Sequence, residues 1–418
     1  MKVTNKPLLQ LTDEALRSGR VGLLCNQTSW DFSEGCYLFE QLHRRGRLHR
    51  LFMPEHGLFA ELQDQEALDS GAFYRCLHLE GVDFVSLYGS SEASLSAPLE
   101  KLKDLDAIII DLQDVGCRYY TFISTVEKLF RSLTEHCLQP EVYILDRPNP
   151  AGRQVEGTPI SREYASFIGV EGLPHRHGLT FGELCSFLHS RQNAAFPLTI
   201  IPYPLDRQYA APIALPGAGS TYVKTPCAIY PSPNIPSACT CMVYSGQCLL
   251  EGTNLSEGRG TTRPFEIFGA PFLQPLHEFN RTHRYSNWND PPHPLYSAGA
   301  RLRMLHFIPT FHKHSGAICY GFQLHLTGKP YHSLLHSLRI LRILAQFDGF
   351  AWREGVYEKG NDKTAIELLA GDALLLDYLH GKASECELRQ ALAESEAAWI
   401  DTVKAFTIYP EELFNISS

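Results

Sequence analysis

Charged and polar residues gather in five short segments that could carry chemistry. In the first, Pro54-Glu55-His56-Gly57, proline fixes the backbone before the carboxylate and glycine permits a turn after it. If burial raises the pKa of such a carboxyl group, it can donate a proton to a leaving oxygen near neutral pH. Glu55 is therefore a candidate general acid, with His56 beside it. The alternative is a glutamate that caps the following helix.

The second segment, residues 111–120 (DLQDVGCRYY), combines carboxylates, an amide, a guanidinium and two phenol rings. Carboxylates and amides bind sugar hydroxyls, and aromatic rings stack on the apolar face of a pyranose. The segment therefore favours a hydroxyl-rich ligand. Its candidate contacts are Asp111, Gln113, Asp114, Arg118 and Tyr120. Alternatively, Asp111 caps a helix and the tyrosines belong to the core.

The third segment, residues 146–150 (DRPNP), is a stiff turn that carries Asp146, Arg147 and Asn149. Arg147 could bind a ligand carboxylate through two hydrogen bonds, because its guanidinium matches the geometry of that group. It could equally form a structural pair with an aspartate. All three residues are candidate binding residues.

The fourth segment is His175-Arg176-His177-Gly178, in which His177 is a candidate ligand contact. Two histidines at i and i+2 can bind metal, but a zinc site needs further ligands and none is spaced recognisably. We therefore expect no metal. The alternative is a metallohydrolase that uses His56, both of these histidines and Asp111.

The fifth segment, residues 251–262 (EGTNLSEGRGTT), is the densest in polar groups. Its glycines let backbone N–H groups approach a ligand, and its arginine offers a fork for a carboxylate. The candidate residues here are Glu251, Asn254, Glu257, Arg259 and Thr261. The alternative is an exposed loop with no function.

Two separated carboxylates in a cleft are the working parts of a glycosidase. One protonates the glycosidic oxygen while the other attacks the sugar or activates water, and some enzymes use the acetamide of the substrate instead. Glu55 is the expected acid, with Glu251, Glu257 or Asp111 as candidates for the second catalytic group.

The elements that must position these residues are strands and helices in alternation. Short apolar runs at 21–25, 51–53, 84–87, 107–110 and 142–145 each end on polar or glycine residues. Such runs are typical of parallel strands that are buried on both faces. Because ligands bind at the carboxyl ends of such strands, the segments around Asn26, Glu55, Asp111 and Asp146 should converge there. Helical spacing is present at 33–45, 96–104 and 122–137.

The second half of the chain has a different texture. Residues 200–300 are rich in proline, glycine and tyrosine and favour loops, whereas 315–326 predicts a strand, and 331–347 and 363–408 predict helices with a break near Gly381. We expect an α/β protein with a Rossmann-like, mostly parallel sheet domain (1–208). A smaller mixed α+β domain (209–418) follows, with a ligand cleft between the two.

Composition limits the class of protein. The 418 residues include 37 Lys+Arg and 46 Asp+Glu, a net charge of −9, which argues against a nucleic-acid partner. No apolar run approaches the ~18 residues that span a membrane, and no signal peptide is apparent, so we expect a cytoplasmic protein. Nucleotide-binding glycine motifs are absent, and we expect no cofactor.

The ordered motifs VGLLCNQTSW, LFMPEHGLFA, IIIDLQDVGCRYYTFISTV, LDRPNP, LPHRHGLTFGEL, YPSPNIPS and LLEGTNLSEGRGTTRPFEIFGAPF resemble the NamZ family. This resemblance implies an exo-β-N-acetylmuramidase that releases MurNAc from the non-reducing end of fragments such as MurNAc-GlcNAc. It also implies that Glu55 is the catalytic acid. Asn234, within YPSPNIPS, joins the candidate binding residues. The lactyl carboxylate of MurNAc suits Arg147 or Arg259.

The expected partner is thus a saccharide derived from muropeptides, and the expected assembly is a monomer or homodimer. A second class of function remains open, namely a protein that binds or senses muropeptides without cleaving them. Loss of turnover when Glu55 is changed would separate the two classes.

Overall fold

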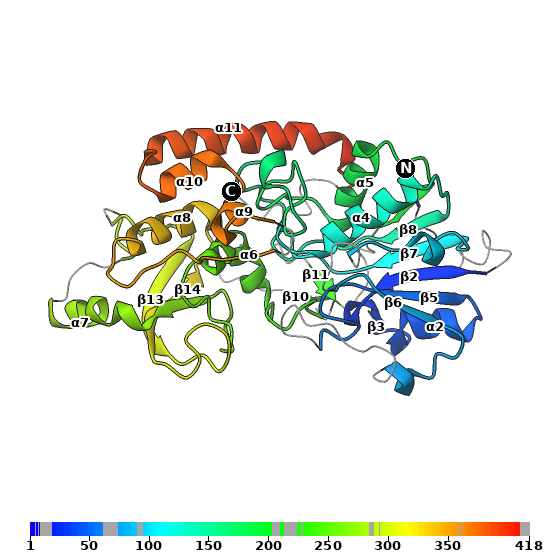
Figure 1. Cartoon of the computed structure of the whole chain (residues 1–418), viewed down its shortest axis with the longest axis horizontal. Helices are drawn as coiled ribbons and strands as arrows, with labels where there is room; N and C mark the ends of the chain where they lie inside the picture. Colours follow the sequence, from blue (N-terminus) through cyan, green and yellow to red (C-terminus); the bar gives the residue numbers. More distant parts are fainter. Residues whose placement is uncertain are drawn as a thin grey trace.

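A seven-stranded sheet forms the first half of the molecule. The computed structural model describes residues 1–4, 6, 8, 19–61, 74–89, 95–202, 210–212, 224–226, 229–283, 288–291, 293–358 and 361–409. The strand order is β1-β9-β8-β7-β2-β5-β6, and every neighbouring pair is parallel (Figure 1). The strands are β1 (Lys2–Val3), β2 (Val21–Cys25), β5 (Leu48–Met53), β6 (Asp83–Ser86), β7 (Ala107–Asp111), β8 (Glu141–Leu145) and β9 (Leu198–Ile201). The prediction of a Rossmann-like, mostly parallel sheet is confirmed.

Helices cover both faces of this sheet. Successive side chains of a strand point to opposite faces, so Leu23 packs towards α2 (Leu38–Arg44), while Leu24 packs towards α4 (Phe122–Glu135) and α5 (Phe181–Arg191). All five residues of β2 and of β7 are buried. Burial on both faces explains why these strands read as continuous apolar runs in the sequence.

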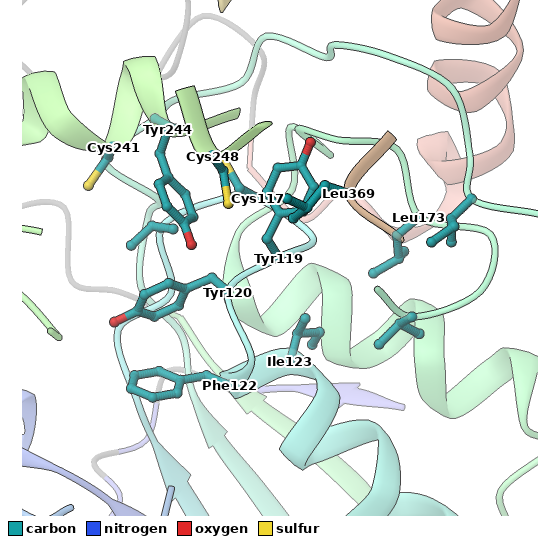
Figure 2. Close-up of a cluster of buried hydrophobic side chains, with 14 of the residues drawn as sticks. Cys117, Tyr119, Tyr120, Phe122, Ile123, Leu173, Cys241, Tyr244, Cys248 and Leu369 are labelled. Carbon is teal, nitrogen blue, oxygen red and sulfur yellow. The ribbon is translucent and has the colours of Figure 1, made fainter. Parts of the chain in front are cut away.

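A smaller sheet marks the second half, which is the predicted mixed α+β domain. Its strands β12 (Ile267–Ala270), β14 (Cys319–Leu326) and β13 (Ala300–Phe307) are antiparallel in that order. The helices here are α6 (Ala238–Gln247), α7 (Gln274–His283) and α8 (Ser333–Leu344). One continuous apolar core joins both halves: the rings of Tyr119 and Tyr120 lie 6.1 Å and 6.4 Å from that of Tyr244 on α6 (Figure 2).

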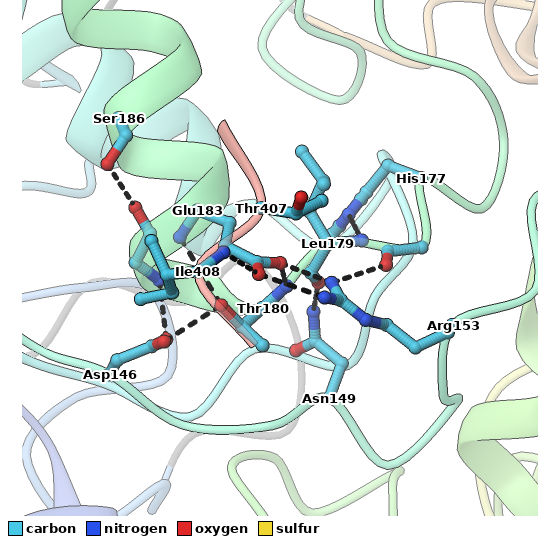
Figure 3. A network of polar contacts seen from close by, with 12 residues as sticks. Asp146, Asn149, Arg153, His177, Leu179, Thr180, Glu183, Ser186, Thr407 and Ile408 are labelled. Carbon is cyan, nitrogen blue, oxygen red and sulfur yellow. Dashed lines mark hydrogen bonds and ion pairs between the residues drawn. The ribbon is translucent and has the colours of Figure 1, made fainter. Parts of the chain in front are cut away.

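The C-terminal helices return to the first half. These are α9 (Ala365–Ala370), α10 (Ala373–Leu379) and α11 (Glu385–Val403), followed by η8 (Lys404–Phe406). In Figure 1, α11 runs along the molecule from the second half to α5. The indole of Trp399 donates to the carbonyl of His177 (2.9 Å), and the backbone N–H of Ile408 donates to Glu183 (2.8 Å; Figure 3). Both ends of the chain therefore stabilise the sheet domain.

Short elements complete the structure. They are η1 (Gln27–Ser29), β3 (Trp30–Asp31), β4 (Cys36–Tyr37), η2 (Tyr74–Leu77), η4 (Leu99–Lys101), η5 (Arg162–Tyr164), β10 (Ala210–Pro212), β11 (Lys224–Pro226), η6 (Cys248–Gly252) and η7 (Pro271–Leu273). None of the described helices is both long and apolar enough to cross a membrane.

Three details differ from the sequence predictions. Residues 96–104 contain only the short turn η4, and in 33–45 the helix begins at Leu38, after β4. The prediction that 200–300 is dominated by loops is wrong where α6, β12 and α7 form. Residues 238–247 (ACTCMVYSGQ) contain few strong helix formers, and their buried contacts with α8 stabilise the helix instead. The predicted boundary at 208/209 lies outside the described residues, and the cleft stays a prediction.

Gly246 lets α6 approach α8 closely. A Cβ atom at this position would lie 2.2 Å from the backbone oxygen of Ser333 and 2.4 Å from the Ser337 hydroxyl. Gly246→Ala should therefore destabilise the protein by about 1–3 kcal/mol, because the two helices must separate. Urea unfolding measures this loss. Cys239→Ala, on the partly exposed side of α6, should change stability by less than about 1 kcal/mol. Equal effects of the two changes would contradict the close approach.

Candidate active site

The site begins where β2, β5, β7 and β8 end at one edge of the sheet. Cys25 pairs with Asp111 in register, which places the segments after β2 and β7 next to each other. The backbone N–H of Gln113 donates to Thr28 (3.2 Å), whose hydroxyl donates to Asn26 (2.7 Å). The Gln113 side chain in turn donates to the carbonyl of Pro148, after β8 (3.0 Å). These bonds tie the ends of three strands together, as the sequence predicted.

Glu55 lies at the end of β5 on a turn with unusual backbone geometry. The N–H of Gly57 donates to the carbonyl of Pro54 (3.3 Å), and both His56 (φ +74°) and Gly57 (φ +84°) are left-handed. A left-handed residue with a side chain is strained, and such residues cluster at functional sites. The hydroxyl of Thr121, at the start of α4, donates to Glu55 Oε2. The turn and this bond together fix a partly exposed carboxylate at the sheet edge.

Asp111 and Arg147 form an ion pair where β7 and β8 end, at the same edge of the sheet. Nε and Nη2 of Arg147 donate to Asp111 Oδ1 at 3.1 Å and 2.6 Å. Burial raises the pKa of Asp111, and the guanidinium partly offsets that effect. The Arg147 side chain keeps 21% of its surface exposed, whereas Asp111 keeps 3%. Arg147 therefore faces solvent from a fixed position, and Asp111 is its buried support.

Asp146 and Asn149 hold the surrounding loops. Asp146 accepts from the N–H of Gly182 (2.6 Å) and from Thr180 (2.8 Å) at the start of α5, and burial raises its pKa to about 6 (Figure 3). Asn149 donates to the carbonyl of Leu179 (2.5 Å). Both are buried, and these bonds hold the start of α5 and the loop before it in place.

Asp114 and His177 face each other in the interior, both fully buried. The N–H of Leu179 donates to His177 Nδ1 (3.2 Å), so the neutral ring carries its proton on Nε2, 3.8 Å from Asp114 Oδ1. Asp114 also accepts from the N–H of Gly116 (2.6 Å). Among the described residues, Asp114 Oδ2 and His177 Nε2 have no hydrogen-bond partner.

Arg118 does not reach the sheet edge, contrary to the prediction of a ligand contact. Its fully buried guanidinium donates to the carbonyls of Thr158, Leu173, Leu369 and Ala370 at 2.9–3.3 Å. These bonds join α9 to the sheet domain, because a buried guanidinium needs acceptors for its N–H groups. Arg118 is a structural residue in this arrangement.

The histidines do not form a metal site in the described part of the chain. His175 Nε2 lies 3.0 Å from Arg118 Nη2, and burial followed by this guanidinium lowers the His175 pKa well below its usual value. A neighbouring cation opposes metal binding. No group of three or more His, Cys, Asp or Glu side chains that could hold a metal ion occurs among the described residues. The metallohydrolase alternative therefore has no structural support.

The charged side chains of segment 251–262 belong to a largely buried ion cluster. We define the ion cluster as Glu251, Glu257, Arg259 and Lys313. Arg259 donates to Glu251 (2.7 Å) and lies 3.3 Å from Glu257, while Lys313 donates to Glu257 (3.0 Å). Burial alone would raise the pKa of Glu257, but Lys313, His312 and Arg259 outweigh it, and the pKa is lowered. Every charge here has an opposite partner inside the cluster.

The remaining predicted contacts are local. Asn254 bonds the backbone of Gly349 (2.7 Å) and Ala351 (3.0 Å), and Thr261 donates to the carbonyl of Gly258 (2.6 Å). Asn234 is buried, and its N–H donates to Ser232 (3.3 Å). Tyr120 is buried too; burial, followed by the carboxylate of Asp114, raises its pKa, with a smaller effect from Glu55. Of these four, only Tyr120 is connected to Glu55 by these observations.

A line of aromatic rings connects the sheet edge to the ion cluster. Tyr120 lies 6.4 Å from Tyr244, Tyr244 lies 4.7 Å from Phe265, and the Arg259 guanidinium lies 5.3 Å from the Phe265 ring. Figure 2 shows Tyr120 and Tyr244 in this line. The ion cluster is therefore joined to the Glu55 region through packed rings, whereas Glu251 and Glu257 themselves pair with Arg259, Tyr357 and Lys313.

The ion cluster generates a stability prediction. Lys313→Met leaves a buried glutamate without its lysine and should cost about 3–5 kcal/mol in urea unfolding. Lys382→Met, which removes an exposed pair with Asp377 at 3.8 Å, should cost less than about 1 kcal/mol.

The ion cluster should also make stability depend on pH. Because the folded pKa of Glu257 is lowered, its contribution to the free energy of unfolding is present above its unfolded pKa of ~4.3 and is lost as pH falls below that value. Glu257→Gln should remove that acid-dependent part; unchanged pH dependence would contradict the account.

Comparisons with known proteins identify the family of this chain. The family model "Exo-beta-N-acetylmuramidase NamZ, N-terminal" matches residues 21–238, and its C-terminal counterpart matches 242–409. A relative from Bacillus subtilis strain 168, named peptidoglycan beta-N-acetylmuramidase NamZ, is 34% identical over 284 residues, which are 68% of this chain and 62% of the relative. The chain thus spans under two thirds of that relative's length.

Two solved structures from Bacteroides fragilis share the fold. Both are DUF1343 family proteins at 24% identity that cover 96% of this chain and 97% of their own, with TM-scores of 0.73 and 0.63. Because family models match both the sheet domain and the second half, the chain belongs to the NamZ family.

Proposed function

We propose that this protein is an exo-acting glycoside hydrolase. It releases terminal β-1,4-linked MurNAc from the non-reducing end of peptidoglycan fragments such as MurNAc-GlcNAc. Membership of the NamZ family and the name of the B. subtilis relative support this activity. The observation that carries the proposal is Glu55, a partly exposed carboxylate held at the sheet edge by a strained turn and by Thr121.

Glu55 acts as the general acid. It donates its proton to the glycosidic oxygen as the bond between that oxygen and C1 of MurNAc breaks, so that the leaving sugar departs as a neutral alcohol. A water molecule supplies the hydroxyl group to C1, and its proton restores the acid over the cycle. Thr121 keeps one carboxylate oxygen occupied, which leaves the other to face the substrate.

None of the three predicted candidates for the second catalytic group is a free carboxylate among the residues that the structure describes. Asp111 is bound by Arg147, Glu251 by Arg259 and Tyr357, and Glu257 by Lys313, and all three are buried. This pattern favours a mechanism in which the acetamide of MurNAc assists departure of the leaving group, as in some N-acetylhexosaminidases.

Arg147 recognises the lactyl carboxylate that distinguishes MurNAc from GlcNAc. Its guanidinium has a single carboxylate partner and keeps 21% of the side-chain surface exposed. Arg259, at 16%, donates to Glu251 and lies 3.3 Å from Glu257, so its N–H groups are directed to two partners inside the protein. Of the two arginines predicted from the sequence, Arg147 therefore suits the anion.

Glu55→Gln tests the catalytic role. The amide keeps the shape and hydrogen-bonding capacity of the side chain but cannot donate the proton, so kcat for MurNAc-GlcNAc should fall by at least about 100-fold with little change in KM. Circular dichroism and melting temperature, unchanged from the wild type, serve as the control for folding. A variant with full turnover would sink the assignment, and binding without turnover in the wild type would indicate a sensing protein.

Removing the charge of Arg147 tests substrate recognition. The double variant Asp111→Asn/Arg147→Gln replaces the ion pair with an amide pair and leaves no buried charge. It should lose about 10- to 100-fold in kcat/KM for MurNAc-GlcNAc, the range expected for a hydrogen bond to a charged group. For the same disaccharide with the lactyl carboxylate converted to its uncharged methyl ester, the double variant should have the same kcat/KM as the wild type. A similar loss on both substrates would contradict a role in anion recognition.

A further inference from the structure

Four aromatic residues lie in the β3–β4 hairpin and just after the Glu55 turn. We define the aromatic patch as Trp30, Phe32, Tyr37 and Phe59. Trp30 and Tyr37 are a cross-strand pair of the β3–β4 hairpin, with ring centroids 4.8 Å apart, and Tyr37 lies 5.6 Å from Phe59. Phe59 follows Glu55 by four residues. Phe32 exposes 45% of its surface, and the other three rings are partly exposed.

The hairpin is held against the same strand edge as the catalytic carboxylate. It follows η1, whose cap Asn26 ends β2 and bonds Thr28 (3.0 Å). Gln27 in η1 donates to the carbonyl of Tyr230 (3.0 Å), which secures this segment to the chain that precedes α6. Burial is the largest cause of the raised pKa of Asp111, and the nearby carboxylate of Asp31 in the hairpin raises it further. The hairpin thus follows β2 at the same edge of the sheet at which Glu55 and Arg147 follow β5 and β8.

Two amide groups beside the patch have unused hydrogen-bonding capacity. Asn26 Nδ2 and Gln27 Oε1 are buried atoms without a hydrogen-bond partner among the residues that the structure describes, and Asn26 is 1% exposed. One is a donor and the other an acceptor. A ligand with hydroxyl or acetamido groups can satisfy both, and an unsatisfied buried polar group in a native structure calls for such an explanation.

The chemistry of the acid indicates what the patch binds. A general acid must lie within ~2.6–3.2 Å of the oxygen it protonates, and the leaving sugar is bonded to that same oxygen. The leaving sugar therefore lies beside Glu55, on the opposite side of the cleaved bond from MurNAc. Aromatic side chains stack on the apolar face of a pyranose, and the patch is the group of partly exposed rings that adjoins this turn.

We infer that the aromatic patch, with Asn26 and Gln27, binds the leaving sugar, a β-1,4-linked N-acetylhexosamine. This inference rests on the proposed function, because it takes Glu55 as the acid. It assigns recognition of the two sugars to different parts of the edge: Arg147 contacts the lactyl group of MurNAc, and the patch contacts its neighbour. Longer fragments would then extend from the patch away from the sheet.

The test compares two substrates that differ only in the leaving group. MurNAc-GlcNAc has a leaving sugar, whereas the β-fluoride of MurNAc has none. Phe32→Ala and Trp30→Ala should each raise KM for MurNAc-GlcNAc about tenfold and leave cleavage of the fluoride unchanged. Ile400→Ala, an exposed apolar position on α11 (49% exposed), is the matched control and should change neither.

Other outcomes separate this inference from the proposed function. If the patch variants cleave both substrates as the wild type does, or lose both equally, the patch does not bind the leaving sugar and the function stands. If the wild type cleaves neither substrate, the proposed function fails, and calorimetry decides the inference. The wild type should then bind MurNAc-GlcNAc about tenfold more tightly than MurNAc, and Phe32→Ala should abolish that difference in affinity. Equal affinities of the wild type for the two sugars would overturn the inference about the patch.

Discussion

A strand that is covered by helices on both faces has room for polar side chains only where it ends. In this protein β2, β5 and β7 are almost entirely buried, and the chain changes from apolar to polar within one or two residues of each carboxyl end. Since the strands are parallel, these changes occur at one edge. Asn26, Glu55 and Asp111 therefore lie at the same edge although the segments that carry them are up to 85 residues apart. The position of the proposed catalytic carboxylate follows from this packing constraint.

Charge compensation separates the residues that can meet a ligand from those that stabilise the fold. Arg118 and Glu257 are as polar as Arg147 and Glu55, but each is buried with its hydrogen bonds or its charge satisfied inside the protein. A buried charge without a partner would be costly, so these groups are fixed by their partners. Arg147 and Glu55 are also held, by Asp111 and Thr121, yet part of each remains exposed. A binding site requires side chains of this kind, which the protein holds in place on one side and leaves accessible to a ligand on the other.

Much of the fold could be predicted from the sequence, because buried parallel strands read as apolar runs and amphipathic helices as periodic ones. The Glu55 turn was likewise visible in its Pro-Glu-His-Gly pattern. Partners distant in sequence could not be predicted: Thr121 is 66 residues from Glu55, and Lys313 is 56 residues from Glu257. The polarity of 251–262 suggested a ligand loop, but the residue types alone could not show that its charges pair with one another and with Lys313. Helix α6 was missed because its contacts with α8, rather than its own propensity, stabilise it.

The central claim is that the sheet edge cleaves the bond next to a terminal MurNAc. Product analysis tests it most directly: the purified protein is incubated with MurNAc-GlcNAc and, separately, with a GlcNAc-terminated fragment of the same length. The account predicts free MurNAc and GlcNAc from the first substrate and no product from the second. Release of GlcNAc from the second substrate, or an intact first substrate after long incubation, would contradict it.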